Sequence, residues 1–273
     1  MMGGRLSKNK RHRQSSDIYT VDLHEKRLIK KSSMLVKRDS HAICYTSGFI
    51  YIIGGITFDN ENRPMVSRMC ERYNVATNQS TEIAQAPLPV SNHSACVFQD
   101  SYIFCFGGRH KPNKLSNNIL RYNIEKNAWL CLNLKANSHA KLNFGLTSQG
   151  NCCQINDGHI FIFGGYHENR AVSDQSFLFS YLSEAEESLF AKFKTQSQEL
   201  QKEDIKNKGV WVIKGLNNKK VCFPAPFWDK QTIVQNGKIY CLQNAVSVND
   251  PRVAYSNNRR VLMFDGNKWT SLV

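Results

Sequence analysis

Long apolar runs are missing from this sequence. No stretch approaches the roughly 20 apolar residues that a membrane-spanning helix needs. The first residues also lack the apolar segment of a secretory signal. Cysteine pairs of the C-x-x-C type and Cys/His clusters at zinc spacing are missing as well. We therefore expect a cytoplasmic protein whose nine cysteines stay reduced.

The short motifs of common enzyme classes are also missing. The chain contains no H-E-x-x-H, no G-x-S-x-G, no P-loop and no dinucleotide-binding glycine pattern. Two of its histidines, His41 and His93, lie at matching places in repeated elements and are interpreted as packing or turn residues. We expect no catalysis, no cofactor, no metal site and no small-molecule substrate.

Negative charge is scarce, with 22 acidic against 36 basic residues. Residues 5–13 hold five of the basic residues and no acidic one. This pattern predicts a flexible basic tail over residues 1–14, with a folded domain over 15–273. A solubilising role is the simplest interpretation, and contact with nucleic acid, an anionic membrane or an acidic partner stays open.

Aromatic strands that end at a glycine pair recur along the chain. Three copies are complete and a fourth keeps the strand without the glycines: Gly48–Gly55, Ser101–Gly108, Gly158–Gly165 and Gly237–Asn244. The glycine pairs are 53 and 57 residues apart. Each run is apolar on both faces, as expected for a sheet packed between neighbouring sheets. Such a period is typical of stacked repeat architectures.

Each repeat contains four predicted antiparallel strands. A short strand precedes each aromatic run and joins it through a tight polar turn, such as Asn156-Asp157-Gly158. An outer hairpin follows, for example 119–124 with 128–132. Cys44, Cys96 and Cys153 recur on the first strand, and we interpret them as small buried residues.

The repeat resembles the kelch repeat. The resemblance rests on the glycine pair after an aromatic strand, on Tyr122 seven residues before Trp129, and on the roughly 50-residue period. It implies an all-β fold, a kelch-type β-propeller with about four complete four-stranded blades. It also implies a protein partner, as in kelch relatives that recognise ubiquitin-ligase substrates or bind the cytoskeleton.

Two segments depart from a regular propeller. Residues 17–29 look like the outer two strands of a further N-terminal half blade, so the ring is expected to be incomplete and to be finished by more chain or by a partner. Residues 183–208 interrupt the third repeat. A capping-box start at Ser183 and the spacing of Leu189, Phe193 and Leu200 predict a helical insertion there. A tolerated surface insertion and a docking element both remain open for it.

The loops that follow the glycine pairs are predicted to meet at one mouth of the propeller. Arginine, histidine and tyrosine gather in them, and the candidate binding residues are Arg63, Arg109, His110, Tyr166, His167 and Arg170. Guanidinium groups bind carboxylates in bidentate geometry, so the predicted ligand is another protein with an acidic segment. The predicted function is an interaction module or adaptor. The alternatives are loops without a common ligand, and a structural subunit completed by a partner chain.

Overall fold

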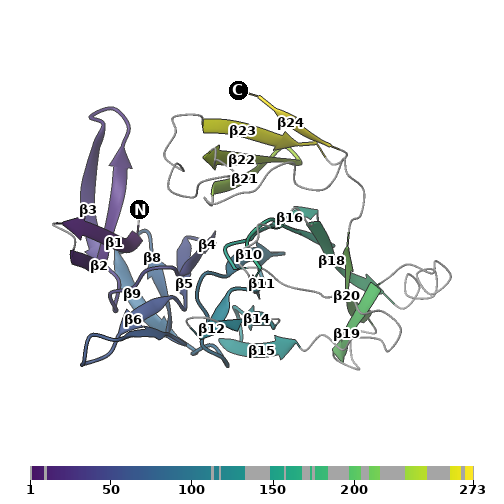
Figure 1. The fold of residues 1–273 in the computed structure, drawn as a ribbon, viewed down its shortest axis with the longest axis horizontal. Coiled ribbons are helices and arrows are strands. Elements are labelled where there is room, and N and C mark those ends of the chain that lie inside the picture. The colour runs from purple at the N-terminus through teal and green to yellow at the C-terminus, as the bar shows by residue number, and fades with distance from the viewer. Residues whose placement is uncertain are drawn as a thin grey trace.

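The computed structural model describes residues 2–8, 11–111, 114–116, 118–132, 148–156, 158–167, 173, 176–183, 197–203, 209–215, 231–244, 259–265 and 268–272. The sheets are arranged around a common centre, from the purple N-terminal sheet to the yellow C-terminal one (Figure 1). Within the described ranges, no helix has the length and apolar character that crossing a membrane requires. The predicted all-β propeller is confirmed.

Four sheets are the predicted blades, each built from antiparallel strands in the order inner to outer. Their strands are, for blade 1, β4 (Ala42–Thr46), β5 (Phe49–Ile53), β8 (Cys70–Asn74) and β9 (Gln79–Ile83); for blade 2, β10 (Ser94–Phe98), β11 (Tyr102–Phe106), β14 (Ile119–Asn123) and β15 (Ala128–Leu132); for blade 3, β16 (Asn151–Asn156), β17 (His159–Phe163), β18 (Ser176–Ser183), β20 (Gly209–Gly215) and β19 (Ser197–Glu203); and for blade 4, β21 (Gln231–Gln235), β22 (Lys238–Asn244), β23 (Arg259–Phe264) and β24 (Trp269–Ser271).

Apolar side chains fill the space between each blade and the next. The three blade–blade cores are separate clusters, and each takes buried residues from both neighbours. Between blades 2 and 3, for example, the rings of Phe104 and Phe179 lie edge to face with centroids 5.1 Å apart. A sheet with two apolar faces is therefore stable only in a stack, which is why the aromatic strands show no polar alternation.

The Tyr and Trp of the repeat have distinct tasks in blade 2. The Tyr122 hydroxyl donates to Asn127 Oδ1 at 2.8 Å and so closes its own outer turn. The Trp129 Nε1–H donates to the Ala84 carbonyl of blade 1 at 2.7 Å. In blade 1, Tyr73 and Asn78 repeat the first contact at 2.7 Å. The signature residues thus join turn geometry to the contact between blades.

The repeated cysteines are buried, as predicted. Cys44, Cys96 and Cys153 lie in three successive inner strands and form part of the blade–blade cores. Burial raises the pKa of the Cys70 and Cys241 thiols to about 11, so both stay protonated at neutral pH. These cysteines act as small apolar residues.

Backbone contacts hold the blades together at the ends of the glycine-terminated strands. The Asn92 N–H of blade 2 donates to the Ser40 carbonyl of blade 1 at 2.8 Å, and the Gln149 N–H of blade 3 donates to the Asn92 carbonyl at 2.7 Å. Each of these residues lies two positions before the inner strand of its blade. Three blades are thereby linked by hydrogen bonds next to the central axis.

In the first two pairs, the second glycine makes room for the segment that leads into the inner strand of its own blade. At Gly108, where φ is +79°, an added Cβ would lie 2.7 Å from the Cβ of His93 and closer still to the Ser91 carbonyl oxygen. At Gly55 the same atom would lie 2.7 Å from the Asp39 carbonyl oxygen. Only glycine fits such a close approach of two backbones.

The N-terminal segment is a sheet, and the prediction of a flexible tail over residues 1–14 was wrong. Strand β1 (Met2–Lys8) pairs with the first half of β2 (Arg11–Asp22), whose second half pairs with β3 (Arg27–Ser33) as predicted for the half blade. The Gln14 side chain donates to Asp39 Oδ2 at 2.9 Å and to the Ile56 carbonyl at 2.6 Å. Hydrogen bonds to blade 1 thus order a segment whose charge suggested a solvated tail.

The predicted helical insertion over residues 183–208 is wrong where the structure describes it. Ser183 ends β18, and residues 197–203, including Leu200, form β19 against the outer edge of β20. A free strand edge supplies backbone partners, and such tertiary contacts override local helix propensity. Leu189 and Phe193 lie outside the described residues.

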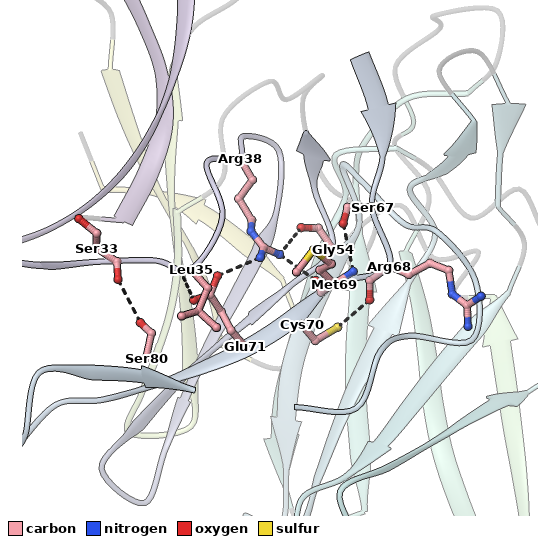
Figure 2. Close-up of polar contacts among 10 residues, drawn as sticks. All are labelled: Ser33, Leu35, Arg38, Gly54, Ser67, Arg68, Met69, Cys70, Glu71 and Ser80. Carbon is pink, nitrogen blue, oxygen red and sulfur yellow. Dashed lines mark hydrogen bonds and ion pairs between the residues drawn. The ribbon is translucent and has the colours of Figure 1, made fainter. Parts of the chain in front are cut away.

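A buried ion pair joins the N-terminal sheet to blade 1. Arg38 donates to Glu71 Oε1 at 2.9 Å and to the carbonyls of Gly54 and Met69, while Glu71 Oε2 accepts the Leu35 N–H at 2.7 Å (Figure 2). Both side chains are about 1% exposed. Burial raises the pKa of Glu71 and lowers that of Arg38, because both charged forms lose hydration. The pair depends on its hydrogen bonds to offset that loss.

Blade 2 has an apolar pair at the same places. The bridges and registers of the two blades make Val90 the counterpart of Arg38, and Leu120 the counterpart of Glu71. We therefore predict that Glu71→Leu alone lowers the free energy of unfolding by about 3–5 kcal/mol, because it leaves a buried guanidinium unpaired. The double variant Arg38→Val/Glu71→Leu should recover part of this loss in urea unfolding. A double variant that is no more stable than Glu71→Leu would contradict this assignment.

The glycine contacts give a second prediction. Gly108→Ala should lower the melting temperature by several degrees, because the methyl group meets backbone atoms and the residue needs positive φ. Gly158→Ala is the matched control, since its added Cβ meets nothing within 4 Å. Differential scanning fluorimetry of the two variants checks the claim, which fails if they melt at the same temperature.

Candidate functional site

The candidate site lies at the end of the central channel where the glycine pairs end the second strands; we call this end the mouth. The residue after each pair bridges to the segment that enters the inner strand of the same blade. The bridges are Asp39 with Ile56, Ser91 with Arg109, and Ser148 with Tyr166. Three blades thus place equivalent residues at equivalent points, and Arg109 and Tyr166 are two of them.

Two small hairpins extend the mouth beyond the blades. Strands β6 (Ile56–Phe58) and β7 (Pro64–Val66) continue from blade 1, and β12 (Arg109–Lys111) and β13 (Lys114–Leu115) continue from blade 2. Strand β7 contacts β12, so neighbouring hairpins lie side by side. The predicted convergence of these loops is present for blades 1 and 2.

Arg63 is exposed on the first hairpin but already carries ion pairs. Its guanidinium lies 2.9 Å from Asp59 Oδ2 and 2.9 Å from Glu61 Oε2. Hydrogen bonds from the Arg63 backbone and side chain lower the pKa of Asp59. Since its own loop neutralises this arginine, Arg63 contributes little net positive charge to the mouth.

The other predicted residues differ in exposure. Arg109 and His110 are half-buried on β12, and His167 is half-buried after β17. Tyr166 is buried, and this burial raises the pKa of its phenol. Arg170 lies outside the described residues. Of the three arginines in the predicted site, the structure places Arg63 and Arg109 on the hairpins of the mouth.

A cavity of about 410 Å³, which was not predicted from the sequence, lies at the mouth end of the channel. Its wall is formed by the starts of the inner strands β4, β10 and β16, together with Thr232 and Ile233 of β21. These inner strands also contact one another in that order. Such a volume is in the range of ligand-binding pockets.

The polar residues of this wall come from the repeat itself. His41 and His93 line it, although the sequence suggested only a packing role for them. Gly150 stands at the corresponding place in blade 3, and Asn151 follows it. In the sequence, the only indication of this cavity is that Gly150 replaces the histidine found at this position in the first two repeats.

The chain is similar to proteins with kelch repeats. The family model described as the KLHDC2/KLHL20/DRC7 Kelch-repeats domain matches residues 1–165 and 40–222. Kelch-like protein 41a of Danio rerio is 26% identical over 155 residues, covering 57% of this chain and 24% of that protein. Kelch-like protein 38 of Homo sapiens is 30% identical over 129 residues, covering 47% of this chain and 21% of that protein.

A horseshoe-crab protein and a solved structure are also among the similar proteins. Beta-scruin of Limulus polyphemus is 32% identical over 100 residues, covering 35% of this chain and 11% of that protein. The solved structure titled "Structure of YjhT" superposes with a TM-score of 0.61 at 13% identity, covering 98% of this chain and 82% of that one. The chain spans at most about a quarter of the first curated relatives that it matches. From the match of the family model over most of its length, the chain belongs to the kelch-repeat β-propeller family.

Proposed function

We propose that this protein is an interaction module that binds a segment of another protein at the mouth of the propeller. The observation that carries the proposal is the cavity of about 410 Å³ framed by the inner strands, next to the half-buried Arg109. Rigid blades hold both in place, and loops on a rigid scaffold are common binding sites. Binding, and not catalysis, is the proposed activity.

The proposed ligand is a peptide with an acidic segment. The chain carries a formal charge of +14, which favours acidic partners through long-range attraction. Arg109 bridges to Ser91, two residues before the cavity-lining His93, and so places a guanidinium group close to the cavity. We place the protein in the cytoplasm, where its cysteines stay reduced. Ubiquitin-ligase substrates and cytoskeletal proteins are the partner classes that the family suggests.

Arg109→Ala tests the mouth. Peptides selected from a displayed random library against the whole chain should be enriched in Asp and Glu. Their affinity, measured by fluorescence polarisation, should fall about tenfold or more in Arg109→Ala because a guanidinium contact with the peptide is lost. Arg27→Ala is the matched control, since Arg27 is exposed on the N-terminal sheet. Equal affinity of the wild type and Arg109→Ala would contradict binding at the mouth.

A second candidate function is that of a subunit whose open ring is covered by a neighbouring chain. Apolar side chains of the inner strands are exposed at the open side of the ring: Ile43 (52%), Tyr45 (64%) and Ile233 (60%). Cys152 is the counterpart of Ile43 in blade 3, Cys96 is the counterpart of Ile233 in blade 2, and both cysteines are buried. Val21 and Leu28, which take the Tyr and Trp places of the half blade, are also half exposed. Apolar surface of this kind favours association.

Sedimentation velocity tests this second candidate. The wild-type chain should self-associate as its concentration rises, and Tyr45→Ser/Ile233→Ser should shift it toward the monomer because it removes apolar surface at the open side. Leu130→Ser, on the outer strand β15, is the matched control. A wild-type chain that stays monomeric at every concentration would rule out this candidate and leave the first one standing.

A further inference from the structure

At one place in the channel, the third blade differs from the first two. At the residue before the inner strand, blades 1, 2 and 3 have His41, His93 and Gly150; at the next residue they have Ala42, Ser94 and Asn151. In blade 3, Gly150 therefore has no side chain where the other blades have an imidazole, and Asn151 adds a carboxamide at the next residue. Gly150 and Asn151 both line the cavity at the mouth.

The Asn151 side chain is buried and incompletely hydrogen-bonded. The residue is 6% exposed, and its Nδ2 atom has no hydrogen-bond partner among the described residues. A buried N–H donor without an acceptor is unfavourable, and a ligand that brings an acceptor removes that cost. By contrast, the Ser94 hydroxyl of blade 2 donates to the Phe106 carbonyl at 3.5 Å, so the corresponding group there is satisfied within its own blade.

The other residues of the cavity wall indicate what kind of hydrogen-bond acceptor a ligand would bring. Two imidazoles, those of His41 and His93, border the cavity, and no acidic residue lies among its described lining residues. The same wall contains Ile43, Ala95 and Ile233, of which Ile43 and Ile233 are exposed to solvent. A ligand in this cavity therefore meets both apolar side chains and polar nitrogen-bearing side chains.

We infer that this cavity is a subsite for a carboxylate side chain of the bound partner, with the Asn151 amide as its principal donor. The methylene stem of a glutamate would pack along Ile43 and Ile233, and its carboxylate would accept from Asn151 with His93 beside it. The inference rests on the proposed function, because it names what part of an acidic peptide enters the channel. Gly150 supplies the space that an imidazole fills in the other two blades.

The side-chain amide of Asn151 can be observed directly in the whole ¹⁵N-labelled chain. The probe is N-acetylglutamate N-methylamide at up to ~20 mM, and the matched probe is N-acetylglutamine N-methylamide, which has the same shape without the charge. We expect the Asn151 NH₂ resonances, assigned from their absence in Asn151→Asp, to shift saturably with the glutamate compound. The shift should be at least about threefold smaller with the glutamine compound. No shift, or equal shifts with both, would overturn the inference.

A pair of isosteric variants separates this subsite from the mouth as a whole. Asn151→Asp puts a negative charge in the cavity and should weaken the selected acidic peptides about tenfold or more. Asn74→Asp adds the same charge at an outer turn, where Oδ1 already accepts two backbone N–H groups, and should leave their affinity unchanged. If Arg109→Ala weakens the peptides and Asn151→Asp does not, the carboxylate subsite is wrong and the mouth stands. If neither Arg109→Ala nor Asn151→Asp changes the affinity for the peptides, the proposed function fails, and the resonance shifts alone decide whether the subsite exists.

Discussion

The close approach of two backbones beside the glycine pair is the constraint on which the rest of the structure depends. At Gly55 the N–H donates to the Val90 carbonyl of the next segment at 2.8 Å. At Asn92 and Gln149 the entering chain is hydrogen-bonded to the blade before it. A Cβ at Gly54 would collide with Val90, and a Cβ at Gly55 would meet Asp39 and His41, which lead into the inner strand of the same blade. The same contacts set where each inner strand begins, and so they set both the ring and the wall of the channel.

The blades meet this constraint with different chemistry. Blade 1 uses the buried pair of Arg38 and Glu71, which also fixes Leu35 and hence the chain that leaves the N-terminal sheet. Blade 2 has Val90 and Leu120 at these places and relies on apolar packing. Because a buried ion pair is rarely more stable than an apolar pair, its use here is best explained by the N-terminal sheet, whose backbone it must bind.

Much of the fold could be predicted from the sequence because each repeat is specified by residues that lie close together in the chain. A short aromatic strand, a tight turn and a glycine pair specify each inner hairpin, and three copies specify the stack. The two failures, at residues 1–14 and 183–208, concern strands that pair with the edge of the next strand along the chain, β1 with β2 and β19 with β20. Single-segment patterns do not contain that edge. The site was predicted in part for a similar reason: Arg109 follows a visible motif, whereas Asn151 stands out only once the inner strands are placed around one cavity.

The mouth is the proposed binding face of the molecule, since the contacts beside the glycine pairs position Arg109, Tyr166 and the channel wall together. Hydrogen–deuterium exchange of the whole chain, with and without a selected acidic peptide, tests this most directly. Bound peptide should slow exchange in the mouth segments 54–67 and 107–111 and in the strand entries 91–95 and 149–152. The outer turns 74–79 and 123–128 should exchange as in the free chain. Protection confined to the outer turns would contradict the account.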